Sequence, residues 1–208
     1  MATTTPNYGW AVPTSTDLVK DGATAIETLG DAIDASMNTA LGTKKAMGVL
    51  LNTTTFSAVS SFSLPTDTFT STYDHYRILL NITTASTTIG HTVRFRAAGS
   101  DSSAATYNYY NRNSSSSSGA DTNTFARSQT SGVLFPVSLG TDLQTYVIDV
   151  MAPKLSQVTT LLFQATGAVA NHNYGVVAFN NTTSFDSLSV ICSSGNFTGN
   201  YSVFGVNK

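Results

Sequence analysis

The sequence predicts a mainly β protein, an antiparallel β-sandwich of jelly-roll-like form preceded by an extended N-terminal segment and one α-helix. Three observations support this. The chain holds 26 Ser and 33 Thr among 208 residues, whereas only 11% of it is charged. After Gly48, short runs of Val, Ile, Thr, Tyr and Phe alternate with clusters of turn-forming residues, as in proteins built of strands. Before Gly48, the chain carries one helical pattern.

The first segment, residues 6–13, is predicted to be extended because prolines at both of its ends disfavour helix. It contains Tyr8 and Trp10, and Trp10 is the only Trp of the chain. Aromatic side chains are common where one protein surface binds another. Trp10 is therefore either a docking residue or part of an ordinary core.

A helix is predicted over residues 16–41, with Thr14 or Ser15 as the N-cap and Gly42 at the end. Its apolar residues follow a short heptad pattern, which forms a narrow stripe. Such a stripe suits self-association, docking on a partner, or packing against the chain's own β-domain. The candidate residues for docking and oligomerisation are Tyr8, Trp10, Leu18, Ile26, Leu29 and Ile33.

The charge balance changes near Gly48. Residues 1–48 hold five acids and three bases, whereas the rest of the chain holds seven of each. This change predicts two domains, an attachment and oligomerisation segment over residues 1–46 and a β-sandwich over residues 47–208.

Strands are predicted throughout the second domain. The alternation is clearest in residues 74–84, where Tyr76, Ile78, Leu80 and Ile82 would line one inner face. The number and spacing of the strands favour a sandwich or jelly roll. The predicted ranges are 48–52, 55–62, 74–84, 92–98, 105–111, 133–138, 144–152, 158–166, 173–180, 186–193 and 200–206.

An aromatic run precedes residues 113–119, a Ser-rich stretch that predicts a flexible loop. Rings supply contact area and Asn or Arg supplies directional hydrogen bonds, so this region suits recognition of a saccharide or a protein. The alternative is a strand with inward Tyr residues and a solvated hairpin. The candidate contacts to a host surface are Tyr107, Tyr109, Tyr110 and Arg112.

Several partner classes are disfavoured. The ten Lys and Arg residues are scattered among twelve acids, so no nucleic-acid surface is expected. No apolar run approaches the roughly 20 residues that span a bilayer, and the first residues do not form a signal peptide. Cys192, the only cysteine, is predicted to be a small buried apolar residue.

No catalytic residue, metal site or cofactor is predicted. His75, His91 and His172 are isolated, and the last two are expected in loops. With a single Glu in the chain, paired carboxylates would have to come from Asp residues, most of which lie beside turn residues. No sequence motif for acyl or phosphoryl transfer is present.

The opening of the chain resembles the N-terminal segment of many tailed-bacteriophage virion proteins. The similar stretch is residues 5–34, TPNYGWAVPTSTDLVKDGATAIETLGDAID. Looser similarity to the β-rich part of these proteins lies in YDHYRI at 73–78, RFR at 94–96 followed by GSD at 99–101, and YSVFG at 201–205.

This resemblance implies a non-enzymatic structural protein of the virion, assembled in the cytoplasm of a host bacterium. Its N-terminal region would attach to another virion protein of the capsid or tail, and its exposed β-domain would commonly form a homotrimer. Because one β-domain follows the helix, we expect a short fibre or spike with a role in host attachment, for which a surface glycan is the candidate receptor. Capsid decoration is the alternative, and a glycan-degrading tailspike is the third hypothesis.

Overall fold

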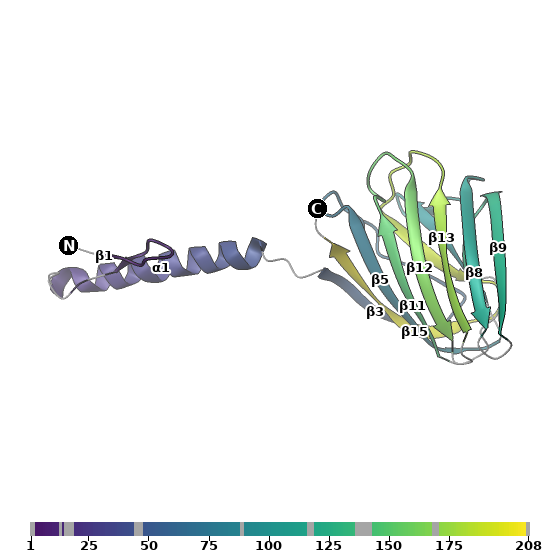
Figure 1. The fold of residues 1–208 in the computed structure, drawn as a ribbon, viewed down its shortest axis with the longest axis horizontal. Coiled ribbons are helices and arrows are strands. Elements are labelled where there is room, and N and C mark those ends of the chain that lie inside the picture. The colour runs from purple at the N-terminus through teal and green to yellow at the C-terminus, as the bar shows by residue number, and fades with distance from the viewer. Residues whose placement is uncertain are drawn as a thin grey trace. The chain divides into compact units, whose positions relative to one another are not determined.

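The structure is a computed structural model that describes residues 3–12, 14, 19–43, 48–87, 90–115, 119–135, 143–167 and 171–206. The chain divides into two compact units, Met1–Ala46 and Met47–Lys208. Figure 1 shows a helix in the first unit and a set of strands in the second. The boundary lies where the charge balance of the sequence changes.

The first unit combines a small hairpin with the helix. Strands β1 (Thr3–Thr4) and β2 (Ala11–Val12) pair antiparallel, and α1 spans Val19–Thr43. Gly9 adopts a positive φ of 68° in the turn, a conformation that glycine reaches without steric cost. Residues 15–18, which include the predicted helix start and Leu18, lie outside the described residues. The segment predicted to be extended thus forms a hairpin within the described residues.

The second unit consists of two antiparallel sheets in its described part. The smaller sheet has the order β10 (Gly132–Phe135), β6 (His91–Ala97), β14 (Ser187–Cys192) and β4 (Ser61–Ser63), with β7 (Ser100–Asp101) paired to β6. The larger sheet has the order β3 (Val49–Val59), β15 (Phe197–Val206), β5 (His75–Ala85), β11 (Gln144–Met151), β12 (Thr159–Gly167), β13 (Asn171–Phe179), β8 (Tyr107–Ser115) and β9 (Ala120–Gln129). The predicted fold class, a mainly β antiparallel sandwich preceded by one helix, is confirmed.

The core lies between the two sheets and follows from alternation along the strands. Tyr76, Ile78, Leu80 and Ile82 of β5 are all buried, as the pattern predicts. Aromatic rings from both sheets meet there. Phe95 of β6 stacks on Phe185 at a centroid distance of 5.1 Å, and Phe185 meets Phe179 of β13 edge-on.

Several predicted strand boundaries are wrong. The predicted break at residues 53–54 does not exist, because β3 runs unbroken beside β15. Strand β8 continues to Ser115, so part of the expected loop is paired, and residues 116–118 lie outside the described chain. Strand β9 was not predicted, because this edge strand is mostly polar and lacks a buried alternating face.

Two histidines also differ from expectation. His91 begins β6 and is fully buried, and His172 is a paired residue of β13, so neither lies in a loop. Their Gly and Asn neighbours resemble turn residues, but the sheet ladder overrides this local preference. Cys192 is buried as predicted, and burial raises the pKa of its thiol.

Candidate functional site

The outward-facing side of the larger sheet carries the candidate site. The strand register aligns outward residues into rows that cross the strands. One row runs over six strands from an ion pair to an exposed aromatic ring. In order across the sheet, this apolar row consists of Arg77, Asp149, Leu162, Val176, Tyr110 and Phe125.

A second row lies beside the first, two residues along each strand. It mixes apolar and polar side chains, and its members pair in the same register. In order, this mixed row consists of Leu79, Val147, Gln164, Tyr174, Arg112 and Asn123. We call the two rows together the outer band.

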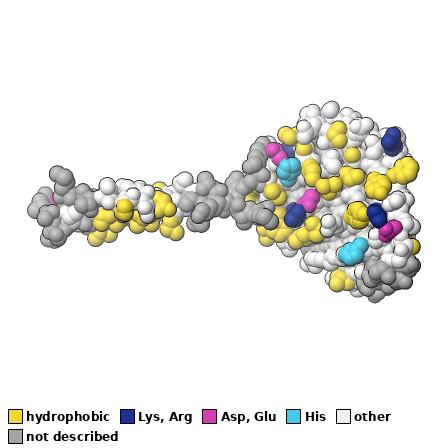
Figure 2. Space-filling model, in the orientation of Figure 1, with side chains coloured by type: hydrophobic (Ala, Val, Ile, Leu, Met, Phe, Trp, Pro, Cys, Tyr) yellow, Lys and Arg dark blue, Asp and Glu magenta, His cyan; other side chains and the backbone are white. Residues whose placement is uncertain are grey.

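The outer band exposes large side chains to solvent. Phe125 is 75% exposed, Tyr174 is 44% exposed, and Tyr110 and Leu162 are each 42% exposed. Figure 2 shows hydrophobic side chains running across this face of the sandwich, with charged groups beside them. Contiguous exposed apolar surface with a polar rim is typical of an interaction or ligand-binding site.

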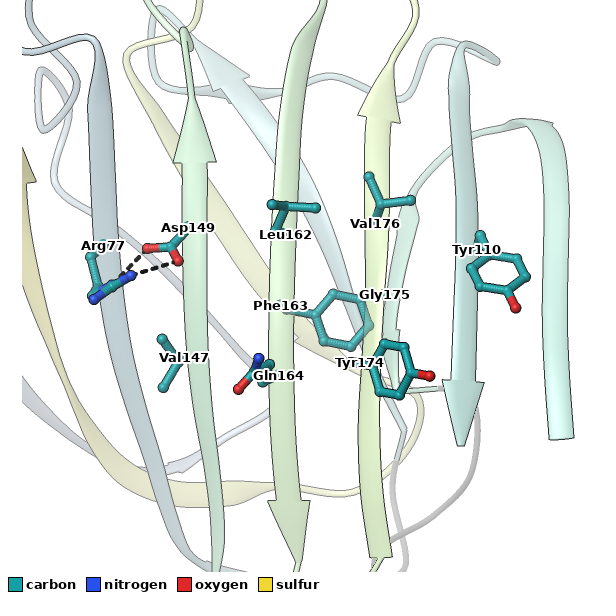
Figure 3. Close-up of a pocket in the computed structure, with 10 residues that line it drawn as sticks. All are labelled: Arg77, Tyr110, Val147, Asp149, Leu162, Phe163, Gln164, Tyr174, Gly175 and Val176. Atoms are coloured by element: carbon teal, nitrogen blue, oxygen red, sulfur yellow. Dashed lines mark hydrogen bonds and ion pairs between the residues drawn. The ribbon is translucent and has the colours of Figure 1, made fainter. Parts of the chain in front are cut away.

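Two adjoining hollows lie in the outer band. The first has a volume of about 600 Å³ and extends from Arg77 to Tyr110, over a floor that includes Leu162 and Val176 (Figure 3). The second, of about 310 Å³, lies between Tyr110 and Phe125. Both hollows are lined by Tyr110 and Val176, so they adjoin at these residues, and we refer to the two together as the depression.

An ion pair forms one end of the first hollow. Arg77 donates from Nε to Oδ1 of Asp149 at 2.7 Å and from a terminal nitrogen to Oδ2 at 2.9 Å. The hydrogen bond and the charge of Asp149 raise the pKa of Arg77. The bidentate geometry holds both side chains in a defined orientation.

At the other end of the depression, polar contacts orient the residues of β8. Tyr110 donates its hydroxyl hydrogen to Oδ1 of Asn123 at 3.0 Å, and Arg112 forms an ion pair with Asp121. Hydrogen bonds from Ser114 and Arg112 lower the pKa of Asp121. Side chains on the outward face therefore link β8 to β9.

Only two of the four predicted contact residues of β8 belong to this face. Tyr110 and Arg112 point outward, but Tyr107 is fully buried and Tyr109 packs against the core. The hydroxyl of Tyr107 accepts from the backbone N–H of Phe95 at 2.8 Å and donates to the carbonyl of Ser102 at 3.1 Å. Burial raises the pKa of Tyr107 to about 12. Strand alternation thus corrects the prediction for Tyr107 and Tyr109.

The prediction from sequence missed the residues that surround Tyr110 on neighbouring strands. Leu162 and Gln164 of β12 and Tyr174 of β13 come from segments distant from β8 in sequence, whereas Phe125 lies on β9, the next strand along the chain. One signal was available: alternation that places Leu161 and Phe163 inward leaves Leu162 as an apolar residue facing out.

In the first unit, the predicted docking residues are distributed over the hairpin and α1. Tyr8 is 69% exposed and Ile26 is 65% exposed, whereas Trp10, Leu29 and Ile33 are half-buried. Trp10 links the hairpin to α1, because its indole N–H donates to Oγ of Ser36 at 2.9 Å. Tyr8 stacks on Trp10 with ring centroids 5.0 Å apart.

The described residues contain no group of three or more His, Cys, Asp or Glu side chains placed to hold a metal ion. Nor does the described part of the chain include a helix long and apolar enough to span a membrane.

No protein-family model matches the chain, and no curated protein matches it in sequence. Among solved structures, the galectin LEC-6 of Caenorhabditis elegans is similar at 12% identity and a TM-score of 0.35, over 72% of this chain and 94% of the galectin. Sucrose-6-phosphate hydrolase of Lactobacillus gasseri is similar at 10% identity and a TM-score of 0.33, over 76% of this chain and 28% of the hydrolase. Similarities this low carry no functional inference.

Proposed function

We propose that this chain is a non-enzymatic structural protein of a bacteriophage virion, a short trimeric fibre or spike. Residues 1–46 would dock on another virion protein and oligomerise, and the sandwich of residues 47–208 would be displayed for attachment to a host. The observation that carries the proposal is the pairing of an underpacked helical unit with a separate sandwich that has an exposed outer band.

The helical unit supports the attachment role. Ile26 and Met37 of α1 are 65% and 54% exposed, and Figure 2 shows hydrophobic side chains along one side of the helix. A unit of this size, with one helix and a two-residue-strand hairpin, buries too little apolar surface to be stable alone. Association with further copies or with a partner would cover this stripe.

The resemblance of residues 5–34 to the N-terminal segments of phage virion proteins supports the proposed location on the virion. The outer band supports the role in attachment, since it offers aromatic rings and polar groups on a rigid sheet. The outward faces elsewhere are rich in Ser and Thr, which keep a displayed domain hydrated without added charge.

The location is tested on purified particles of a phage that encodes the chain. We expect mass spectrometry to detect the protein in washed virions and gold-labelled antibody to place it on a surface projection. Absence from washed virions would overturn the proposal. Labelling spread evenly over the capsid would show that the chain is a capsid decoration protein and not a fibre.

The oligomeric state is tested by analytical ultracentrifugation of the full chain. We expect a trimer, and we expect Ile26→Asp combined with Leu29→Asp to yield monomers whose β-unit still unfolds cooperatively. Thr28→Asp is the matched control, because Thr28 is exposed on the same helix and outside the stripe. A wild-type protein that stays monomeric both at high concentration and on the particle would disprove the trimer.

A further inference from the structure

We infer that the first hollow of the outer band binds the pyranose ring of an uncharged saccharide. Tyr174 would provide the stacking surface, and Gln164 on the neighbouring strand would bind a hydroxyl group of the stacked ring. Asp149 and Arg77, two and three strands from Tyr174, would bind hydroxyl groups of the next sugar unit of a longer saccharide. This inference rests on the proposed function, because it names the chemical class that the displayed sandwich would recognise.

A pyranose presents a flat face of C–H groups and a rim of hydroxyls, so its site needs an apolar plane surrounded by hydrogen-bonding groups. Tyr174 supplies such a plane. It is 44% exposed, and Figure 3 shows its ring lying along the sheet rather than standing upright from it. Leu162 and Val176 extend the apolar floor beside the ring.

Hydrogen-bonding groups lie on the side of the hollow toward β11 and β5. Gln164 pairs directly with Tyr174 in the register, and its side chain has no hydrogen-bond partner in the described part of the chain. Its amide offers two donors and an acceptor. The Asp149 carboxylate accepts two hydrogen bonds from Arg77 and retains free lone pairs, while Arg77 retains further N–H donors.

The charges of this hollow favour an uncharged ligand. Among its described lining residues, Arg77 and Asp149 are the charged ones, and they neutralise each other within one bidentate pair. An anionic ligand would have to compete with Asp149 for Arg77 and would be repelled by the carboxylate. Hydroxyl groups can instead donate to Asp149 and accept from Arg77 without breaking the pair.

The shape of the apolar surface favours a saccharide over a protein partner. The apolar surface is widest at β13, where Tyr174, Val176 and Ala178 follow one another on the outward face. On the neighbouring strands it narrows to a single residue, because Thr160 and Gln164 flank Leu162 on β12, and Asn108 and Arg112 flank Tyr110 on β8. A stable protein interface buries about 800 Å² per partner around an apolar centre. A short apolar patch on one strand, with polar residues on both neighbouring strands, suits a ring-sized ligand better.

The test uses the full chain and saturation-transfer NMR with methyl hexopyranosides. The panel contains every epimer at C2, C3 and C4 in both anomeric forms, at millimolar concentration, and glucuronic acid as the anionic comparison. We expect at least one neutral pyranoside to bind, with the strongest transfer to the ring C–H protons of one face. We expect glucuronic acid to bind more weakly than the corresponding neutral sugar.

Variants then separate stacking from hydrogen bonding. Tyr174→Ala should weaken binding at least about tenfold, whereas Tyr174→Phe, which keeps the ring, should stay within about threefold of wild type. Gln164→Ala should weaken it about fivefold. Leu155→Ala is the control, because Leu155 is an exposed apolar residue of the same unit that lines neither hollow, and it should bind as wild type.

Failure of every neutral pyranoside to bind folded wild-type protein would overturn the inference, as would equal binding by Tyr174→Ala. A change of sedimentation on Tyr174→Ala without any sugar binding would make the outer band a protein interface instead. These results leave the virion location untouched, and absence from virions would overturn the location without affecting sugar binding.

Discussion

The two faces of the larger sheet are built by the same strands, yet they have different chemistry. In β12, Leu161 and Phe163 face inward and are at most 3% exposed, whereas Leu162 and Gln164 between and beside them face outward. Two consecutive leucines therefore have unrelated roles, because alternation assigns each residue to a face. Apolar residues are expected on the inner face, where they form the core. Apolar residues on the outer face need another explanation, and they indicate a binding surface.

The inner face has a polar exception at one end. Tyr146 and Asn173 are buried there, and His91 of the smaller sheet, also buried, contacts Tyr146. The Tyr146 hydroxyl lies 2.7 Å from Nδ1 of His91, but Nε2 of His91 and both side-chain polar atoms of Asn173 have no hydrogen-bond partner among the described residues. The inner face is thus mostly apolar, with a minority of costly polar groups that the following changes can test.

The largest expected effect comes from truncating neighbouring residues on opposite faces. Phe163→Ala should lower the free energy of unfolding by about 3–5 kcal/mol, because it leaves a cavity in the core. Leu162→Ala should lower it by less than about 1 kcal/mol, since Leu162 is 42% exposed. Urea unfolding of both variants measures the difference. Similar losses would contradict the distinction between the two faces.

Acid should destabilise the core between the two sheets through His91. Burial lowers the pKa of His91 from 6.5 to about 4. The unfolded chain therefore takes up a proton at a higher pH than the folded chain does. The free energy of unfolding should fall as the pH decreases from about 6.5 to about 4, by about 3 kcal/mol in total from this group. Urea unfolding across this pH range measures the slope.

The matched controls for this titration are two substitutions to Gln. His91→Gln should remove most of the slope, whereas His172→Gln should retain it, because His172 is exposed on β13. A slope that survives in His91→Gln would assign the acid sensitivity to other groups.

Replacing Asn173 by an apolar residue should stabilise the fold. Asn173→Leu has a similar shape and removes two buried polar atoms that have no hydrogen-bond partner in the part of the chain that the structure describes, so it should raise the free energy of unfolding by about 1 kcal/mol. Thermal unfolding would detect the gain. Destabilisation would show that these atoms are satisfied in solution, for example by buried water.

The smallest effect concerns the outer face. Arg77→Ala and Asp149→Ala should each change the free energy of unfolding by less than about 1 kcal/mol, because their side chains are 48% and 35% exposed. A double-mutant cycle would measure their coupling, which should decrease as salt is added. A coupling well above this limit would make the pair a structural element of the sheet.

Much of the fold was predictable from local pattern. The alternation of Tyr76, Ile78 and Leu80 identified β5 and its inner face, since burial of one face requires period-2 placement. Strand β9 was not predictable in this way. Its sequence is mostly polar, and it is a strand because β8 offers a hydrogen-bonding edge. Of the four contact residues that the sequence predicts on β8, Tyr110 and Arg112 lie in the outer band.

By itself, the sequence determined the fold class, the single N-terminal helix and the inward side of the strongest strands. These features depend on spacing within one segment, where side-chain direction follows from backbone geometry. Only the tertiary structure decided that Tyr110, Tyr174, Leu162 and Phe125 share one outer band, because strand order and register join residues distant in sequence. It also decided that Tyr107 belongs to the core, since the face covered by the smaller sheet depends on how the two sheets pack.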